Sequence, residues 1–397
     1  MNWSKVSLSD LFQIGSSKRV LKSQWKSAGV PFYRGREITR LSADGFVEND
    51  LFITEEHFAE LAKRAGVPRA GDIVITAIGT IGNSHVVREC DRFYFKDASV
   101  LWLQKITDVS SRFINLWLKS PLFLNQLNRG NGATVDTLTI QKLQSVQLTI
   151  PPLPEQHRIV AILDEALEGI ATAADSAEKN LANARSVLWS YFHGILANQK
   201  YTIRQLGELC TKFEYGTSSK SDPEGKTPVL RMGNVQNGRF DWTNLAYSND
   251  DEDIKKYLLR PNDVLFNRTN SPELVGKTAI YKGEQPAIFA GYLIRIHRNE
   301  ELLDAEYLTH FLNSDPAKEY GKSVVISSVN QANINGSKLR TYPIPAPSLE
   351  EQRSIAKKFA ELSAETEQLE AIYQQKLAAL DELKKSILHR AFSGQLH

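Results

Sequence analysis

The chain of 397 residues repeats itself once, and this internal repeat restricts its fold more than any other feature of the sequence. Six short motifs of the first half recur in the same order in the second half, at offsets between 191 and 201 residues. Residues 71–75 match 262–266, for example, and residues 155–159 match 351–355. An ordered set of matches at a nearly constant offset predicts a tandem duplication. We expect a globular unit, a long helix, a second globular unit and a second long helix.

Prolines mark where the two long helices should begin. None of the 15 prolines falls between Glu155 and Asp222, and none follows Pro347. The proline-rich stretches 151–154 and 343–347 stand just before these gaps. Proline is tolerated at the start of a helix and breaks its interior, so each stretch indicates a helix entry. The expected boundaries are globular units at 1–150 and 201–347, and helices at 151–200 and 348–397.

Each long segment carries a heptad pattern of apolar residues. In the first segment one seam position holds Ile159, Ala166, Ala173, Asn180, Val187 and Gly194, and the other holds Leu163, Ile170, Ala177, Ala184 and Tyr191. In the second they are Ile355, Leu362, Leu369, Lys376, Leu383 and Arg390, and Phe359, Thr366, Tyr373, Leu380 and Ile387. Stripes of this length are typical of coiled coils, and each helix would extend about 65 Å.

Two matching stripes in one chain favour pairing of the two helices. The alternative is that each helix packs separately on its own globular unit, but a lone stripe of this length would leave too much apolar surface in water. Asn180 at a seam position would fix the register of the pair at some cost in stability.

The composition excludes several classes of protein. The only two cysteines, Cys90 and Cys210, cannot form a disulfide framework, which favours a reducing compartment. Mean hydropathy is −0.33 and no apolar run approaches ~18 residues, so we expect no membrane span. The N-terminus lacks the pattern of a secretory signal, and we expect a cytoplasmic protein. The net charge of +2 hides an excess of basic residues in 1–150, which permits a polyanionic partner.

Each globular unit has a mixed pattern of strands and helices. Residues 72–76 and 263–266 are short β-rich runs, followed by turn sequences at 79–83 and 269–272. Helical patterns come later in each unit, at 112–128 and 305–320. The predicted fold class is α+β.

The sequence lacks the motifs of nucleotide-binding enzymes, amine methyltransferases and metal-dependent nucleases. No strand leads into a glycine-rich phosphate or dinucleotide loop, and the Pro-Pro of residues 151–152 lacks the flanks of an amine-methyltransferase loop. Residues 224–226 and 382–384 spell Glu-x-Lys as in some nucleases, but the first lies in a loop sequence and the second on a long helix. The eight histidines show no metal-ligand spacing, and no nucleophile has an adjacent base. We therefore expect no cofactor, no metal and no catalysis by this chain.

Polar and basic residues instead gather where loops are expected. In the first unit the candidates are Lys18, Arg19, Arg34, Arg36, Thr76, Thr80, Asn83, Arg129, Asn131 and Thr134. In the second unit they are Lys220, Arg231, Asn267, Arg268, Asn270, Lys277, Ser328, Asn330 and Gln331. Arg, Asn and Gln read base edges, and Lys, Ser and Thr hold phosphates, so this set is typical of a DNA-binding surface.

A structural interpretation stands beside the functional one. Arg34 and Arg231 occupy matched positions and are equally well explained as structural ion pairs. Asn83, Asn131 and Asn270 are also common turn formers.

Four motifs together resemble a known family. They are residues 71–82, with the pattern Gly-Asp-Ile-Val-Ile-Thr followed by Gly-Thr-Ile-Gly, residues 267–277, residues 151–156 and the closing residues 387–394. In this order they are similar to the specificity subunit of type I restriction–modification systems, and the resemblance covers the whole chain.

The resemblance implies two target recognition domains separated by two long helices that form an antiparallel coiled coil, in a pseudo-two-fold tandem repeat. Each domain would read one half of a bipartite, asymmetric site in double-stranded DNA. The helices would act as a spacer and dock two methyltransferase subunits, and two restriction/translocase subunits would complete the complex. Residues 348–350 intervene before Glu351 without a counterpart in the first half, and the helix offsets drift from 196 to 200, like a four-residue stutter.

Two other interpretations remain open on the residues. One is a non-enzymatic coiled-coil adaptor that binds only proteins, and salt-dependent DNA binding would separate it from a DNA reader. The other is a nuclease with an unrecognised site, which metal-dependent cleavage by the isolated chain would reveal.

Overall fold

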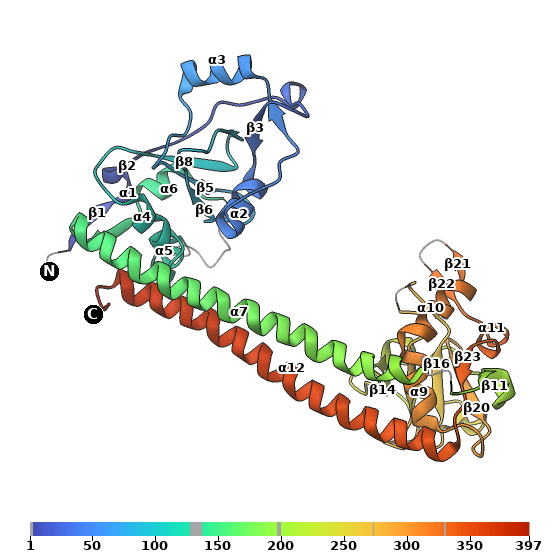
Figure 1. The fold of residues 1–397 in the computed structure, drawn as a ribbon. Helices are drawn as coiled ribbons and strands as arrows, with labels where there is room; N and C mark the ends of the chain where they lie inside the picture. The colour runs from blue at the N-terminus through green and yellow to red at the C-terminus, as the bar shows by residue number, and fades with distance from the viewer. Residues whose placement is uncertain (1–2, 128–136, 197–199, 273, 329–330, 397) are drawn as a thin grey trace. The chain divides into compact units, whose positions relative to one another are not determined.

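The computed structural model describes residues 3–127, 137–196, 200–272, 274–328 and 331–396. The chain forms two compact units, Met1–Glu178 with Gln375–His397, and Lys179–Gln374. The two long helices, α7 (Leu153–Leu196) and α12 (Leu349–Phe392), each contribute one part to each unit (Figure 1).

The first unit is built on a four-stranded sheet of order β2-β8-β5-β6, a three-stranded sheet of order β4-β3-β7 and the pair β1-β9. Its strands are β1 (Ser4–Ser7), β2 (Phe12–Ser16), β3 (Val30–Tyr33), β4 (Phe52–Ile53), β5 (Ile73–Thr76), β6 (Ser84–Val86), β7 (Tyr94–Phe95), β8 (Val100–Lys105) and β9 (Gln147–Ile150). Its shorter helices are α1 (Leu8–Leu11), α2 (Gly35–Asp44), α3 (Glu55–Ala65), α4 (Ser111–Leu118), α5 (Pro121–Leu127) and α6 (Ile140–Gln144), with a 3-10 turn at Lys22–Gln24.

The second unit repeats this architecture strand for strand. Its sheets have the orders β11-β20-β16-β18, β15-β12-β19 and β10-β23, with two small additions, β13-β14 and β17-β22-β21. The strands are β10 (Ile203–Gln205), β11 (Cys210–Tyr215), β12 (Thr227–Leu230), β13 (Val235–Gln236), β14 (Arg239–Phe240), β15 (Ala246–Ser248), β16 (Val264–Asn267), β17 (Thr269–Asn270), β18 (Thr278–Ile280), β19 (Ile288–Phe289), β20 (Leu293–Arg298), β21 (Ile326–Ser328), β22 (Gln331–Asn333) and β23 (Pro343–Pro345). The helices are α8 (Asp251–Tyr257), α9 (Ala305–Asn313), α10 (Asp315–Val324) and α11 (Gly336–Arg340), with 3-10 turns at Leu206–Glu208 and Met232–Asn234. The equivalent strand orders confirm the duplication and the α+β class.

One aspartate shows that the two units are equivalent in atomic detail. Asp72 precedes β5 and accepts hydrogen bonds from the Arg69 N–H and the Trp102 indole, both at 2.9 Å. Asp263 precedes β16 and accepts from the Arg260 N–H at 2.9 Å and from the Arg295 guanidinium at 3.1 Å. Trp102 and Arg295 hold the same register opposite β5 and β16, so the aspartate keeps its role while its partner has diverged.

Each predicted helix of the globular units is divided in two. The expected helix at 112–128 becomes α4 and α5, and the one at 305–320 becomes α9 and α10. Ser120 and Ser314 lie at the breaks, are fully buried, and donate to the carbonyls of Trp117 and Phe311, both at 2.6 Å. Pro121 is the first residue of α5, and Pro316 is the second residue of α10. A backbone N–H has no partner within the helix at these positions, so proline is tolerated there. The expected turn at 269–272 is also wrong in part, because its first two residues form β17.

In each unit the two parts of the long helices pack side by side in antiparallel directions (Figure 1). In the first unit Leu163 shares the hydrophobic core with Leu388 and Phe392, and the Phe392 ring meets Phe113 edge to face at 5.0 Å. In the second unit Tyr191 packs on the core that contains Ile355 and Phe359. The antiparallel coiled coil is confirmed within each unit.

The detailed seam differs from the heptad prediction in one of its two rows. Among residues whose side chains are described, the predicted rows from Leu163 to Tyr191 and from Phe359 to Ile387 are buried or half-buried throughout. The other rows drift outward, so Asn180 and Val187 are exposed, as is Leu383. A helix has 3.6 residues per turn, and a strict repeat of 3.5 moves off its contact stripe unless the helices supercoil. Asn180 therefore does not fix the register from within the seam.

A buried glutamine joins each long helix to its globular unit. The Gln352 amide oxygen accepts from the Asp304 N–H at 2.8 Å, and its nitrogen donates to the carbonyls of Leu302 and Pro347 at 2.9 and 3.0 Å. Gln156 likewise accepts from the Ser110 N–H at 3.0 Å and donates to the Pro151 carbonyl at 2.9 Å. These bonds give a structural reason for the repeated Glu-Gln after each proline-rich stretch.

Candidate nucleic-acid interface

The candidate residues of each unit centre on the turn that follows β5 or β16. In the first unit the turn is closed by hydrogen bonds from the Thr76 N–H to the Asn83 carbonyl and from the Gly82 N–H to the Thr76 carbonyl. In the second unit the Asn267 and Gly276 N–H groups make the same two bonds, to the carbonyls of Lys277 and Asn267. Gly82 and Gly276 have φ of +91° and +92°, a conformation that favours glycine. The two turns are therefore equivalent supports for different side chains.

The turn of the first unit presents hydroxyl and amide groups. Thr76 is fully buried, and its hydroxyl donates to the Thr80 carbonyl and accepts from the Asn83 N–H at 3.0 Å, so its side chain holds the turn rather than the surface. Thr80 is exposed, and its hydroxyl lies 2.8 Å from that of Thr39 on α2. The Asn83 amide donates to the Thr39 hydroxyl at 3.3 Å. Nothing local in the sequence associates Thr39 with this turn, because tertiary packing of α2 on β5 and β6 brings it there.

The turn of the second unit presents an arginine and amides. The Arg268 guanidinium stacks 4.8 Å from the centroid of the Tyr215 ring and makes long hydrogen bonds of 3.4 Å to the Gly291 carbonyl and the Asn333 amide oxygen. Asn270 is half-buried beside it. Asn267, by contrast, is fully buried and lies in the core below the turn. Tyr215 and Asn333 are contacts that sequence reasoning missed.

Strand pairing brings one further segment to the turn of each unit. In the first unit Thr137 forms an isolated β-bridge with Ile78, and in the second unit β17 pairs with β22 next to the turn. Ser328 and Gln331 belong to the backbone of β21 and β22. Four predicted contacts lie outside the described residues: Arg129, Asn131, Thr134 and Asn330.

The remaining basic candidates divide into free and engaged groups. Lys18, Arg19 and Lys220 are exposed, and no ion pair involves them among the described residues. The Lys277 ammonium donates to the Gln236 amide at 3.1 Å, and Arg231 donates to the Asn244 carbonyl at 3.2 Å.

Arg34 and Arg36 belong to an ion-pair network. Arg34 donates to Glu37 at 2.9 Å and to Asp50 at 3.1 Å, and Arg36 contacts the same two carboxylates at 2.8 and 3.0 Å. Burial opposes ionisation of Glu37, but the hydrogen bonds from the two arginines outweigh it and lower its pKa to about 2. The structural interpretation of Arg34 is supported by this network.

This network predicts a loss of stability in acid. Because the folded-state pKa of Glu37 is lowered, its contribution is present above the unfolded-state pKa near 4.5 and is lost as pH falls toward 2. We expect the melting temperature of the wild type to fall across this window, and that of Glu37→Gln to start lower and fall less. Thermal unfolding followed by circular dichroism at pH 7, 4.5, 3 and 2 measures both. The exposed Glu48→Gln should behave as the wild type, and parallel curves for all three proteins would contradict the prediction.

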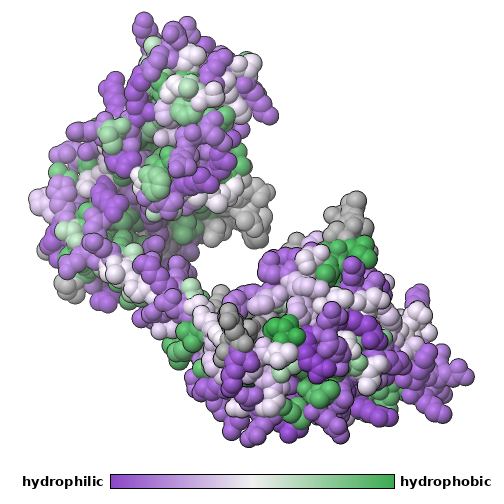
Figure 2. Space-filling model, turned by 45° about the vertical axis from the view of Figure 1, so that its right-hand side comes forward, coloured by the Kyte–Doolittle hydropathy of each residue, from purple (hydrophilic) through white to green (hydrophobic). Residues whose placement is uncertain are grey.

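Two kinds of feature are absent from the part of the chain that the structure describes, a metal-binding cluster and a membrane-spanning helix. Across the residues with described positions, no group of three or more His, Cys, Asp or Glu side chains is arranged to hold a metal ion. No helix in the same part of the chain is long and apolar enough to cross a membrane. Figure 2 shows apolar residues as separate patches on a mostly hydrophilic face.

Comparisons with known proteins agree with the architecture. The family model "Type I restriction modification DNA specificity domain" matches residues 1–179 and 198–378. The chain is 26% identical over 344 residues to the type I restriction enzyme EcoKI specificity subunit of Escherichia coli K12, covering 81% of this chain and 72% of that protein.

Two solved structures share the fold. A chain from a study of complex assembly and conformational transition of the type I R-M system superposes with a TM-score of 0.78 at 19% identity, over 99% of this chain and 98% of that one. The HsdS subunit of Thermoanaerobacter tengcongensis superposes with a TM-score of 0.60 at 19% identity, over 99% and 97%. With two copies of the domain spanning most of its length, the chain belongs to the family of type I restriction–modification DNA specificity proteins.

Proposed function

We propose that this chain is the non-catalytic DNA-reading subunit of a type I restriction–modification complex, and that each unit reads one half of a bipartite, asymmetric site. One observation carries the proposal: two units of the same strand order present different side chains on equivalent turns. The first offers Thr39, Thr80 and Asn83, and the second offers Arg268 and Asn270. Different donors and acceptors read different bases, so the two half-sites should differ.

The exposed cations would position the DNA. Lys18, Arg19 and Lys220 follow β2 and β11 at the same point of the repeat and are free to contact phosphates. Phosphate contacts set orientation and register, whereas base contacts set specificity. The engaged pair Arg34 and Arg36 would reach DNA only by exchanging its carboxylate partners.

The long helices would space the half-sites and dock the catalytic subunits. α7 and α12 are each 44 residues long, and each contributes to both units. Val187, Leu369, Ile372 and Leu383 leave between 43% and 57% of their surface exposed on these helices. These exposed apolar side chains are available for contacts with partner proteins. Two methyltransferase subunits would use the repeated faces, and two restriction/translocase subunits would complete the complex.

Reconstitution tests this function. The purified chain with a methyl donor and host DNA should transfer no methyl groups, and should support site-specific methylation when the cognate methyltransferase subunit is added. Its DNA affinity should fall steeply between 50 and 200 mM salt, because phosphate contacts release counterions. Methyl transfer or metal-dependent cleavage by the isolated chain would refute the non-catalytic role. If the assembled complex bound no DNA at any of these salt concentrations, the protein-only adaptor would be favoured.

Arg268→Ala should relax the half-site read by the second unit. If the guanidinium contacts a base, its loss costs about 1–3 kcal/mol of binding and increases tolerance at one position. Affinity selection from a randomised DNA library, with the methyltransferase complex, measures both effects. Arg260→Ala, which alters another arginine of the same unit away from this turn, should leave site choice unchanged. If Arg268→Ala has unchanged affinity and site choice, the Arg268 contacts to Tyr215 and Asn333 are structural.

A further inference from the structure

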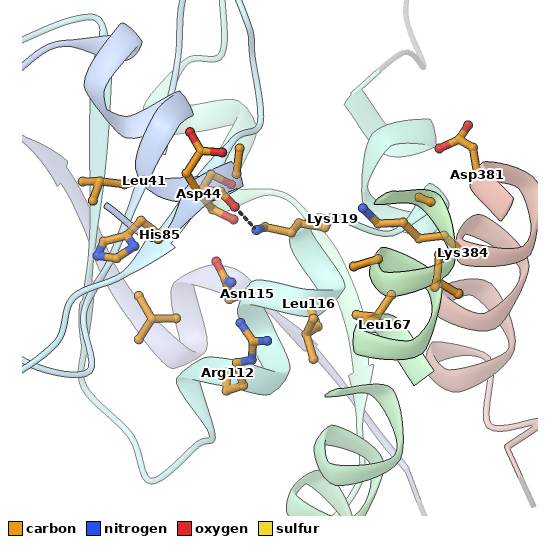
Figure 3. Close-up of a pocket in the computed structure, with 18 of the residues that line it drawn as sticks. Leu41, Asp44, His85, Arg112, Asn115, Leu116, Lys119, Leu167, Asp381 and Lys384 are labelled. Carbon is orange, nitrogen blue, oxygen red and sulfur yellow. Dashed lines mark hydrogen bonds between the residues drawn. The ribbon is translucent and has the colours of Figure 1, made fainter. Parts of the chain in front are cut away.

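A cavity of about 870 Å³ lies within the first unit, where the end of α2, β6 and α4 face α7 and α12 (Figure 3). Its volume falls in the range of small-molecule sites. The long helices supply an apolar part of the wall, with Leu167, Ile170, Leu377 and Leu380, and the charged residues Glu178, Asp381 and Lys384. The opposite side, from α2, β6 and α4, carries polar groups.

The polar side contains a cation without a counter-ion. The Lys119 ammonium donates one hydrogen bond, to the Ser42 carbonyl at 3.0 Å, and no ion pair involves it in the described part of the chain. Figure 3 shows Lys384 extending from α12 toward Lys119, the residue that follows α4. Burial and the positive charges of Arg112 and Lys384 lower the pKa of Lys119 to about 8. The nearby Arg112 is already paired with Asp164 at 2.6 Å.

Two buried polar atoms of the same cavity lining also have no hydrogen-bond partner among the described residues. The Ser84 hydroxyl is on a fully buried residue of β6, and the Asn115 amide oxygen belongs to a residue of α4 that is 3% exposed. Both residues line the cavity. An unpaired buried polar group costs free energy, and a bound ligand or water removes that cost.

The second unit shows that the fold does not require these unpaired groups. The buried serines Ser120 and Ser314 align α4 with α9, so Asn313 stands at the position of Lys119. Its amide bonds to the backbone N–H and carbonyl of Thr278 at 3.1 and 2.8 Å. Thr278, the counterpart of Ser84, donates its hydroxyl to the Gly276 carbonyl at 3.1 Å.

The counterpart of Asn115 is satisfied as well. Thr309 stands at that position and donates to the Ala305 carbonyl at 2.8 Å. In the second unit the three equivalent side chains are thus neutral and hydrogen-bonded. In the first unit the cavity is instead lined by the charged Lys119 and by the unpaired Ser84 hydroxyl and Asn115 amide oxygen, an arrangement suited to binding a ligand.

We propose that this cavity binds a small organic anion, with a carboxylate or phosphate on Lys119 and an apolar body against Leu167, Ile170 and Leu380. Lys384 adds positive charge at the rim, and the Ser84 hydroxyl donates to the anion. The Asn115 amide oxygen accepts from a hydroxyl or amine on the ligand. Ser84 directly follows Asn83 of the first DNA-reading turn, but the cavity lining includes none of the proposed DNA-reading residues, and the site does not depend on the proposed function.

Calorimetric titration of the full chain with octanoate tests the site, with acetate and 1-octanol as probes of the head group and the apolar body. We expect one saturable octanoate site in the wild type and at least tenfold weaker binding of acetate and octanol. Lys119→Asn installs the side chain that the second unit carries, so it should fold with an unchanged melting temperature and bind octanoate at least tenfold more weakly. Lys384→Gln, on the exposed face of α12, should weaken binding about threefold.

The matched control is Lys63→Asn, which removes an exposed lysine of α3 in the same unit and should bind octanoate as the wild type does. Absence of a saturable site would overturn the proposal, as would equal octanoate affinity in the wild type and Lys119→Asn. Acetate binding as tight as octanoate would overturn the assigned ligand class, because the apolar wall would then contribute nothing. A weaker effect of Lys119→Asn than of Lys63→Asn would also exclude Lys119 as the anion contact.

Discussion

Deleting one heptad from each long helix, residues 170–176 and 375–381, is expected to shorten the spacer between the two half-sites by about 3 base pairs and to leave both half-sites unchanged. A heptad spans about 10 Å of helix and a base pair about 3.4 Å of duplex. The two deleted segments lie opposite each other in the first unit, because Ala171 and Ala174 of α7 line the same cavity as Leu377 and Leu380 of α12.

Methylome sequencing of a host that carries the shortened chain and its methyltransferase measures this outcome, since every native site should be lost and a new spacer class gained. Deleting residues 170–176 from α7 only is the matched control. It should abolish methylation, because the two halves of the seam then no longer face each other. A variant that kept the native spacer but recognised new half-sites would show that the helices do not set the spacing.

Gln352→Leu should lower the free energy of unfolding of the second unit by about 4 kcal/mol. Leucine fills a similar volume, but it leaves the Asp304 N–H and the carbonyls of Leu302 and Pro347 without partners in a buried position. Each unsatisfied buried group costs about 1–3 kcal/mol. The substitution also removes the side-chain hydrogen bonds between α12 and its globular unit.

Gln156→Leu in the first unit is the matched variant and should lose less, about 2–3 kcal/mol, because Gln156 makes two such hydrogen bonds rather than three. Urea unfolding of the full chain measures both losses. Gln368→Leu, at an exposed position of α12, should change stability by less than about 0.5 kcal/mol. If Gln352→Leu were as stable as Gln368→Leu, the glutamine would not anchor the helix.

The duplication and the two long helices could be predicted because repeated short motifs, proline positions and heptad patterns are visible in the sequence itself. Proline stops a helix wherever it stands, and a heptad stripe reports that one side of a helix is covered. The stripe does not identify every contact, since its repeat differs from that of a straight helix. Leu163 and Phe359 head rows that are buried or half-buried, whereas Asn180 and Leu383 are exposed.

The candidate DNA interface could be predicted only in outline. The sequence locates the turns after β5 and β16, because short β-rich runs followed by turn sequences mark them, and the structure adds the positive φ of Gly82 and Gly276. It does not reveal that Thr76 and Asn267 point into the core, since both are polar residues at a strand end and their burial depends on the elements packed above them.

The ion-pair and hydrogen-bond partners of the candidate residues also depend on tertiary structure. Asp50 reaches Arg34 and Arg36 from a separate segment, and Thr39 meets Thr80 across the packing of α2 on the sheet. By itself, the sequence determined that two copies of one module and two paired helices exist. Only the tertiary structure decided which side chains face solvent, because contacts between residues far apart in the chain leave no periodic signal in it.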